Sequence, residues 1–260
     1  GEPILIANEE KLKNTFKKIG LNENYKIQVT NSTDKDKSKK YINYLYKKLQ
    51  RKGVLEAECN KLVKTDRVTW GSCMVACGDA DGMVAGNTRH YAATVDKLMQ
   101  SIGSRDDEIV FGLCVFVNRG RTIVIADTNV IEYPTSEELA SIAKSSARVA
   151  KLLGLDPKIA FLSHSTFGQP ETDRTKRISK AVEMLKDEKV DFLFDGEMQP
   201  DVALNNKYKG TYSFSNSVGS ANVLVMPSIH AAAISIKMLK ELSRGKVFGP
   251  LLIGLAQPIE

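Results

Sequence analysis

The segment "KIAFLSHSTFGQP" (residues 158–170) sets the pattern of the second half of the chain. Its first six residues form an apolar run without alternation, typical of a buried strand, and small polar residues follow at once. The same order returns in "DFLFDGEMQPD" (191–201) and "NVLVMPSIHAA" (222–232). Helical patterns follow near 172–187, 200–206 and 231–243. Apolar runs separated by helices predict a parallel sheet that is covered on both faces.

The remaining segments also alternate between strands and helices. Short strands are predicted at 3–7 and 25–29, a strand bounded by glycines at 82–86, and helices at 9–19, 41–51, 55–64 and 66–77. The charged stretch "NSTDKDKSKK" (31–40) is predicted to be a mobile loop. Strands at 108–117 and 122–127 are joined by the tight turn "NRGR", which predicts an antiparallel pair. Thr135 and Glu138 form a capping-box pattern that opens a helix through Leu153.

The composition is that of an ordinary globular protein, with 42% hydrophobic and 26% charged residues in 260. No apolar run approaches the roughly 18 residues of a membrane span, and no signal-peptide pattern opens the chain. Four cysteines in this length do not make a disulfide framework, so reduced thiols and a cytoplasmic location are expected. The start at Gly1 and the stop just after "GPLLIGLAQP" suggest an excised fragment.

The net charge of +6 indicates an anionic partner only if it is concentrated at a site. Much of it lies in helical lysine runs such as "YINYLYKKLQRK" (41–52), which are typical of a solvated helix face. No stretch interleaves aromatic residues with arginine as a nucleic-acid platform does. A small molecule that bears phosphate is therefore the expected anionic partner, with neither nucleic acid nor membrane.

Polar residues gather where the three repeated strands end. Ligands of open parallel sheets bind beyond the carboxyl ends of the strands. Asp195, Glu197 and Asp201 follow one strand there, and we expect them to line a cleft rather than to be buried. The hydroxyls of residues 163–166 either hold a phosphate before a helix or cap that helix.

Other chemistries have weaker support. His164, His230 and Asp195 could meet at one edge of the sheet, but no local spacing of metal ligands exists, and no metal site is expected. Ser163 and His164 lack the Gly-x-Ser-x-Gly elbow of a nucleophile. Cys73 and Cys77 have the spacing of one helix face and are expected to pack in a core. The glycines of 78–88 permit either close packing or approach of a ligand. Loop arginines that could pair with phosphate are Arg89, Arg105, Arg119, Arg121 and Arg174.

Six segments, taken in order, resemble the phosphate acetyltransferase and butyryltransferase family. They are "ADGMVAGNT", "IADTNVIEYPTSEELASIA", "LSHSTFGQP", "DGEMQPDVALN", "ANVLVMPSIHAAAISIKML" and "GPLLIGLAQP". The last two are also similar to the C-terminal domain of bacterial NADP-dependent malic enzymes, in which a phosphotransacetylase-like module follows the malate-oxidising region.

The resemblance implies a fold and a ligand. The fold class would be α/β, with two α/β domains of the isocitrate dehydrogenase-like architecture, whose parallel-rich sheets are flanked by helices. The first would take residues 1–133, completed by 249–260, and the second 134–248. The cleft between them would receive coenzyme A and acyl phosphate. By this resemblance Gly86, Thr88, Ser165, Thr166, Asp195, Glu197 and Asp201 would face it.

The sequence departs from the family pattern in two places, and these departures favour one functional hypothesis over the others. The family continues the segment that matches Ala256–Glu260 with an Asp-Leu-Ser-Arg-Gly motif, which lies beyond this sequence, and Met99 stands near a place where arginine is usual. The first hypothesis is therefore a regulatory module that binds acetyl-CoA or coenzyme A without catalytic residues of its own. NADP and a divalent metal would then belong to an absent malic-enzyme region, which converts malate to pyruvate.

Two other hypotheses remain. The chain could be an active phosphate acetyltransferase, in which Asp195, Asp201 and Ser165 would be catalytic. A hydride-transferring dehydrogenase of the same architecture is disfavoured because the sequence has no metal-binding aspartate cluster. For the first two, the family implies a homodimer or higher homo-oligomer built through the second domain. The apolar helix 231–242 is the candidate contact, because it is apolar on more than one face.

Overall fold

The computed structural model describes residues 1–21, 27–86, 89–168, 170–215 and 217–259. Its contacts divide the chain into two compact units, Gly1–Ser104 with Leu255–Glu260 and Arg105–Gly254. The main segment of the first unit ends at Ser104, earlier than the expected boundary at residue 133. The reason is that the hairpin of β3 (Phe111–Asn118) and β4 (Arg121–Ala126) pairs with strands of the second unit. The chain returns to the first unit at Leu255, later than the expected residue 249, since β8 (Lys246–Ile253) also pairs with β3.

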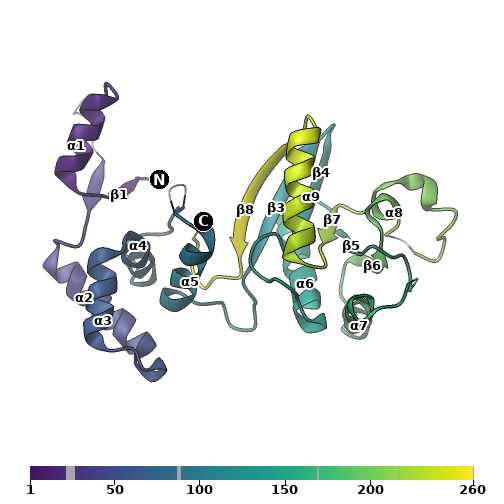
Figure 1. Cartoon of the computed structure of the whole chain (residues 1–260), viewed down its shortest axis with the longest axis horizontal. Coiled ribbons are helices and arrows are strands. Elements are labelled where there is room, and N and C mark those ends of the chain that lie inside the picture. Colours follow the sequence, from purple (N-terminus) through teal and green to yellow (C-terminus); the bar gives the residue numbers. More distant parts are fainter. Residues whose placement is uncertain (22–26, 87–88, 169, 216, 260) are drawn as a thin grey trace. The chain divides into compact units, whose positions relative to one another are not determined.

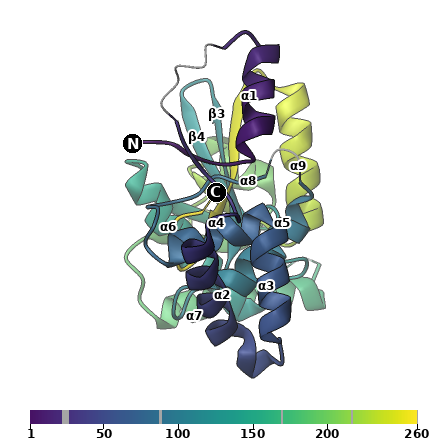
Figure 2. The ribbon, with the colours of Figure 1, turned by 90° about the vertical axis from the view of Figure 1, so that its left-hand side faces the viewer.

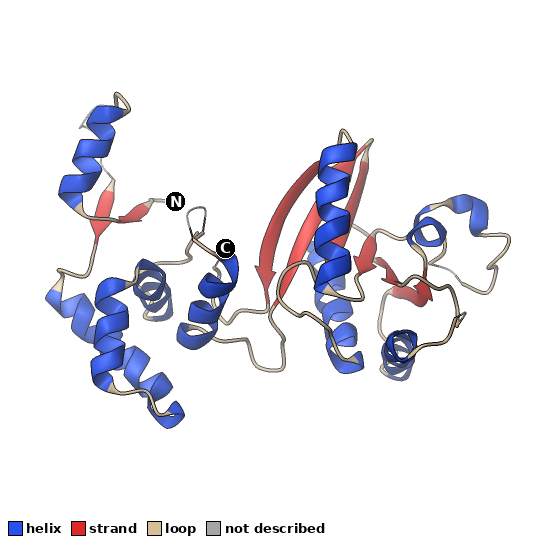
Figure 3. Ribbon diagram, viewed as in Figure 1, coloured by secondary structure: helices blue, strands red, loops and turns tan. Residues whose placement is uncertain are grey.

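The first unit is a small α/β unit that consists mainly of helices (Figure 3). Strands β1 (Ile4–Ile6) and β2 (Gln28–Thr30) pair in parallel. The helices are α1 (Glu9–Lys18), α2 (Lys35–Leu49), η1 (Gln50–Lys52), α3 (Glu56–Thr65), α4 (Arg67–Ala76) and α5 (Tyr91–Ser101). Tyr41, Trp70 and Cys73 are buried together in the core, and Cys77 packs against them. The predicted core role of the two cysteines is confirmed.

Two predictions for this unit were wrong, and one helix was missed. Helix α2 begins inside the predicted loop 31–40, because Asp34 caps it by accepting a hydrogen bond of 3.0 Å from the Lys37 N–H. The predicted strand 82–86 forms only an isolated bridge between Met83 and Ile259. Helix α5 was not predicted at all. The predicted strand 25–29 begins in a stretch outside the described residues, and its observed part is β2.

The second unit contains a six-stranded sheet in the order β6-β5-β7-β4-β3-β8. The strands not yet defined are β5 (Lys158–Leu162), β6 (Leu193–Met198) and β7 (Val223–Val225). Strands β6, β5, β7 and β4 are mutually parallel, as the apolar runs predicted. The antiparallel pairing of β3 with β4 is also confirmed. β8 escaped prediction because its residues are exposed or only half-buried, so no buried strand pattern marks it.

Helices cover both faces of this sheet (Figure 1). Helices α6 (Ser136–Leu152) and α7 (Asp173–Asp187) pack on the face that includes Val124, Phe161 and Val223. Helices α8 (Pro200–Leu204) and α9 (Ile229–Leu242) pack on the opposite face. Figure 2 shows α6 and α9 on the two sides of the sheet. A short helix, η2 (Asn206–Tyr208), follows α8. None of the described helices has the length and apolar character needed to cross a membrane.

A buried carboxylate secures the loop that follows β4. Asp127 is 2% exposed and accepts backbone hydrogen bonds from Gly112 on β3 (2.7 Å) and from Asn129 (2.9 Å) and Ile131 (2.6 Å). Burial raises the pKa of this carboxyl, and the backbone donors oppose the shift. The side chain thus fixes the loop to the neighbouring strand, which no feature of the sequence had indicated.

Replacement of Asp127 by Asn should lower the free energy of unfolding by about 1–3 kcal/mol. In the wild-type chain, backbone N–H groups donate to both carboxylate oxygens of Asp127. The asparagine amide keeps only one acceptor oxygen, and its NH2 group would face a backbone N–H that has lost its acceptor. Chemical denaturation followed by circular dichroism measures the change. Asp156→Asn is the matched control, because its side chain is 84% exposed, and it should shift stability by no more than about 0.5 kcal/mol. Equal effects of the two substitutions would contradict the structural role of Asp127.

Candidate functional site

The predicted polar segments meet at one edge of the second unit's sheet. β5, β6, β7 and β4 are parallel neighbours, so the loops after their carboxyl ends lie on the same edge. Those loops begin at Ser163, Gln199, Met226 and Asp127. This is the edge at which open α/β sheets bind ligands.

Glu197 is the central group of this edge, and its position corrects a prediction. It lies inside β6 and is 1% exposed, whereas we expected the three acids to be unburied. One carboxylate oxygen accepts hydrogen bonds from the Gly168 N–H (2.6 Å) and the Ser165 hydroxyl (3.3 Å). The other accepts from the Ser179 hydroxyl of α7 at 2.8 Å. Neutral donors therefore satisfy a carboxylate that has no lysine or arginine partner in the described ranges.

The hydroxyls of 163–166 serve the same network. Ser165 is 1% exposed, and its oxygen lies 3.3 Å from that of Ser163. The Thr166 hydroxyl accepts a hydrogen bond of 3.1 Å from the Gln199 N–H, and the Gln199 amide donates to the His164 carbonyl at 2.7 Å. These contacts fasten the loop after β5 to the end of β6. They do not cap α7, whose N-cap is Thr172.

The other two acids lie in different surroundings. Asp195 accepts a hydrogen bond of 2.9 Å from the Gly196 N–H and lines a cavity of about 560 Å³ along β6, which Glu197, Phe194 and Phe214 also line. Asp201 accepts a hydrogen bond of 2.8 Å from the Tyr208 hydroxyl and lines a separate cavity of about 510 Å³. The structure thus joins Ser165 to Glu197, but it does not place Asp195 and Asp201 in one cavity.

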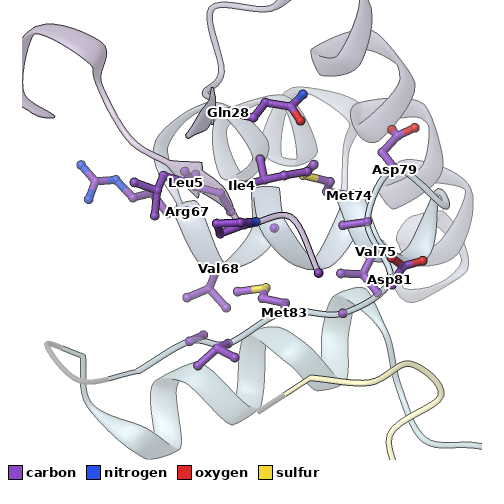
Figure 4. A pocket seen from close by; sticks show the side chains of 18 of the residues that line it. Ile4, Leu5, Gln28, Arg67, Val68, Met74, Val75, Asp79, Asp81 and Met83 are labelled. Carbon is purple, nitrogen blue, oxygen red and sulfur yellow. The ribbon is translucent and has the colours of Figure 1, made fainter. Parts of the chain in front are cut away.

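Gly86 belongs to the first unit, and Thr88 lies outside the described residues. Gly86 lines a cavity of about 890 Å³, shown in Figure 4, and its φ of +118° is a conformation that favours glycine. Apolar side chains such as Ile4, Val68 and Met83 line this cavity, and Asp79 and Asp81 lie at its side. Its size is within the range of small-molecule sites.

The histidines and cysteines do not form a reactive centre among the described residues. His164 Nδ1 lies 3.4 Å from the Ser163 hydroxyl, and His230 Nε2 lies 3.3 Å from a carboxylate oxygen of Glu132. Within the described ranges, no three His, Cys, Asp or Glu side chains group as metal ligands would. Burial raises the pKa of the Cys73 thiol to about 12, which keeps it protonated and unreactive at neutral pH.

An arginine with an aromatic partner lies at the same edge of the sheet. The Arg174 guanidinium, in the first turn of α7, lies 5.3 Å from the centre of the Tyr133 ring. The His230 ring, at the start of α9, lies 5.9 Å from the same ring. The sequence named Arg174 as one of five loop arginines, but it gave no signal that Tyr133 and His230 join it.

Comparison with curated proteins finds similarity to two kinds of bacterial protein. The chain is 43% identical over 261 residues to an NADP-dependent malic enzyme of Rhizobium meliloti, covering 100% of the chain and 34% of the relative. It is 30% identical over 270 residues to a phosphate acetyltransferase of Acetivibrio thermocellus, covering 98% of the chain and 79% of the relative. The chain thus spans about a third of the length of the malic enzymes that it matches.

Solved structures and family models agree with this result. A phosphotransacetylase from Streptococcus pyogenes matches with a TM-score of 0.90 at 28% identity, covering 99% of the chain and 79% of that structure. The model of the phosphate acetyl/butaryl transferase family matches residues 1–260. With the match extending over the whole sequence and the fold agreeing, the chain belongs to the phosphate acetyl/butaryl transferase family.

Proposed function

We propose that this chain is an acetyl-CoA-binding regulatory module of an NADP-dependent malic enzyme. The main support for this proposal is the similarity to malic enzymes, which covers all of the chain and only about a third of those proteins. Oxidative decarboxylation of malate to pyruvate would then occur in another region, which would hold NADP and a divalent metal. The module would bind acetyl-CoA or coenzyme A and would not transfer the acyl group.

The edge of the second unit's sheet offers groups suited to such a ligand. Arg174 has no carboxylate partner within 4 Å in the described part of the chain, so its charge is available to a phosphate. Guanidinium groups match phosphate oxygens with paired hydrogen bonds, and they stack on planar rings. Tyr133 and His230 add flat surfaces beside it. Coenzyme A carries phosphates and a planar base, and both would find partners here.

The acids of the same edge support binding without chemistry. Acyl transfer between a thiol and phosphate needs positive charge and a base placed where charge develops. Glu197 is enclosed by neutral donors, so it is not free to take a proton from coenzyme A. Asp195 and Asp201 add negative charge near a polyanionic ligand. Met99 on α5 supplies no charge at the place where the family usually has arginine.

Replacement of Ser165 and Thr166 together by alanine should weaken acetyl-CoA binding about 5- to 150-fold, as expected when buried hydrogen-bond partners are lost. The effect would arise because the loop loses its links to Glu197 and Gln199. Isothermal titration calorimetry measures the dissociation constant. Thr15→Ala is the control, since that exposed hydroxyl bonds only a carbonyl of its own helix. Unchanged binding in the double variant would place the ligand elsewhere.

A second candidate function is phosphate acetyltransfer, favoured by the similarity to phosphate acetyltransferases over 98% of the chain. We expect the chain to form acetyl-CoA from acetyl phosphate and coenzyme A at well below about one turnover per second, the low end of usual enzyme rates. Loss of one electrostatic group alone costs about 10²–10³ in rate. The Acetivibrio thermocellus relative, assayed in parallel, is the positive control. Turnover of one per second or faster would establish the transferase instead.

The module is also proposed to form a homodimer through α9. Ile234, Met238 and Leu242 are spaced four residues apart on this helix and are 61%, 54% and 81% exposed. Such spacing places them on one face. Phe248 of β8, 54% exposed, adds apolar surface in the same unit. A second copy of the chain would remove this surface from water, with each Å² contributing about 25 cal/mol.

Met238→Glu should convert the dimer to a monomer, because it places a charge inside an apolar contact. Multi-angle light scattering at micromolar concentration gives the mass. Lys240→Glu, on the same helix, is the control for a change of charge and should leave the dimer intact. A wild-type chain that is monomeric under these conditions would refute the contact.

A further inference from the structure

The largest cavity of the first unit borders a strand with an open edge. Among the described residues the sheet of this unit consists of β1 and β2, so one edge of β1 pairs with no strand. The cavity of about 890 Å³ in Figure 4 is lined by all of β1 and by the segment 82–86. An open strand edge is a template on which another strand can pair. The segment 82–86 is the part of the chain that lies nearest at hand to do so.

The pairing of β1 with β2 determines which of its backbone groups face the open edge. Ile6 is paired with Thr30, and the Ala7 N–H donates to the Thr30 carbonyl at 3.1 Å. The N–H and C=O of successive residues point to alternate sides of a strand, so Leu5 and Ala7 face β2. Ile4 and Ile6 then face the open edge. The Ile4 carbonyl and the Ile6 N–H are therefore the groups that a further strand would bond.

The segment 82–86 presents complementary groups on its own free side. Its isolated bridge joins Met83 to Ile259, and the Met83 N–H donates to the Pro258 carbonyl at 3.1 Å. By the same alternation, the N–H and C=O of Val84 point away from that bridge. The Val84 side chain is apolar and yet 89% exposed. The segment thus has one occupied side and one free side, as β1 has.

The side chains of β1 and this segment already converge on α4. A Cβ placed on Gly71 of the helix would lie 2.7 Å from both Ile6 Cδ1 and Met83 Sδ. Ile6 and Met83 therefore lie on the faces of their segments that point toward α4. Side chains alternate between two faces along an extended chain, so Leu5 and Val84 point the other way. Both segments thus present their side chains in the same alternation, as neighbouring strands must.

We propose that the segment 82–86 closes onto β1 as a third parallel strand, with Val84 beside Leu5. Helices α2, α3 and α4 connect β2 to this segment, and a helical crossover joins strands that run in parallel. In this register the Val84 N–H donates to the Ile4 carbonyl, and the Val84 carbonyl accepts from the Ile6 N–H. Since the segment is not a strand in the structure, the closed pairing is a second conformation, in which the chain itself fills the cavity.

Closure would change the edge at which this unit can bind a ligand. In the same register Gly86 lies beside Ala7, the first residue after β1. The carboxyl ends of parallel strands are the usual place for ligands in α/β units. A Cβ on Gly86 would meet nothing within 4 Å, so the end of the segment has room to move. The segment is thus a strap that forms or opens part of a binding edge, and its closure does not depend on the acetyl-CoA site proposed in the other unit.

Disulfide cross-linking of the whole 260-residue chain tests the closure. Leu5→Cys combined with Val84→Cys places two thiols side by side on one face in the closed register, at a separation that a disulfide can span. Leu5→Cys combined with Met83→Cys is the matched control, because its thiols would point to opposite faces. Under mild oxidation we expect the first pair to cross-link at least about tenfold faster, since thiols that point apart cannot be bridged without movement of the backbone. Peptide mapping by mass spectrometry identifies the bridged residues and separates them from the four native cysteines.

Hydrogen exchange of single amides, followed by NMR, is the second measurement and decides alone if a cysteine variant fails to fold. In the unmodified chain the Ile6 and Val84 amides should exchange at least about tenfold more slowly than unstructured amides, because closure places both in hydrogen bonds. Val84→Pro removes one donor and breaks the pairing, so it should return Ile6 to fast exchange. Ala7, which bonds Thr30 of β2, should keep its protection.

Three results would each overturn the closure. The first is equal cross-linking of the two cysteine pairs. The second is unprotected exchange of Val84 in the unmodified chain. The third is an Ile6 amide whose protection survives Val84→Pro, since that protection would then come from burial rather than from the pairing.

Discussion

Two carboxylates, buried with no lysine or arginine partner among the described residues, hold the edge of the sheet on which the candidate site depends. Taking a charge out of water costs several kcal/mol unless strong hydrogen bonds replace the water. Asp127 obtains them from backbone N–H groups, and Glu197 from Gly168 N–H and two serine hydroxyls. Each carboxylate thereby fixes the loop that follows one strand. The loops after β4 and β5, which border the candidate site, are therefore held by these two carboxylates.

This use of Glu197 changes how the acidic segment after residue 190 is interpreted. Three acids close together in sequence could form a catalytic cluster, in which one acid raises the pKa of another. In the structure Asp201 lies apart and accepts a hydrogen bond from the Tyr208 hydroxyl, whereas Asp195 and the buried Glu197 both line the cavity beside β6. Each acid thus has a structural partner of its own. The three acids therefore do not share one cavity in the structure.

The sequence predicted those parts of the fold in which local pattern and final environment agree. The parallel core follows from apolar runs in β5 and β7 that are buried on both faces, and the Thr135 capping box forms as its spacing indicated. β8 was missed because its residues are exposed or only half-buried, so that no buried strand pattern marks the segment that pairs with β3. The burial of Glu197 could not be predicted from the sequence either, since two of its hydrogen-bond donors lie 29 and 32 residues away along the chain.

The contacts around Gly196 explain why a glycine precedes Glu197 in β6. Its φ of +151° is one that L side chains rarely adopt, and a Cβ there would lie 2.7 Å from both the Cβ and the carbonyl oxygen of Phe161 on β5. The missing side chain lets β6 approach β5 closely at the position where the Glu197 side chain turns inward. Without that approach the carboxylate could not reach the Gly168 N–H, and the loop after β5 would lose its anchor. The glycine is therefore as necessary to the site as the acid that follows it.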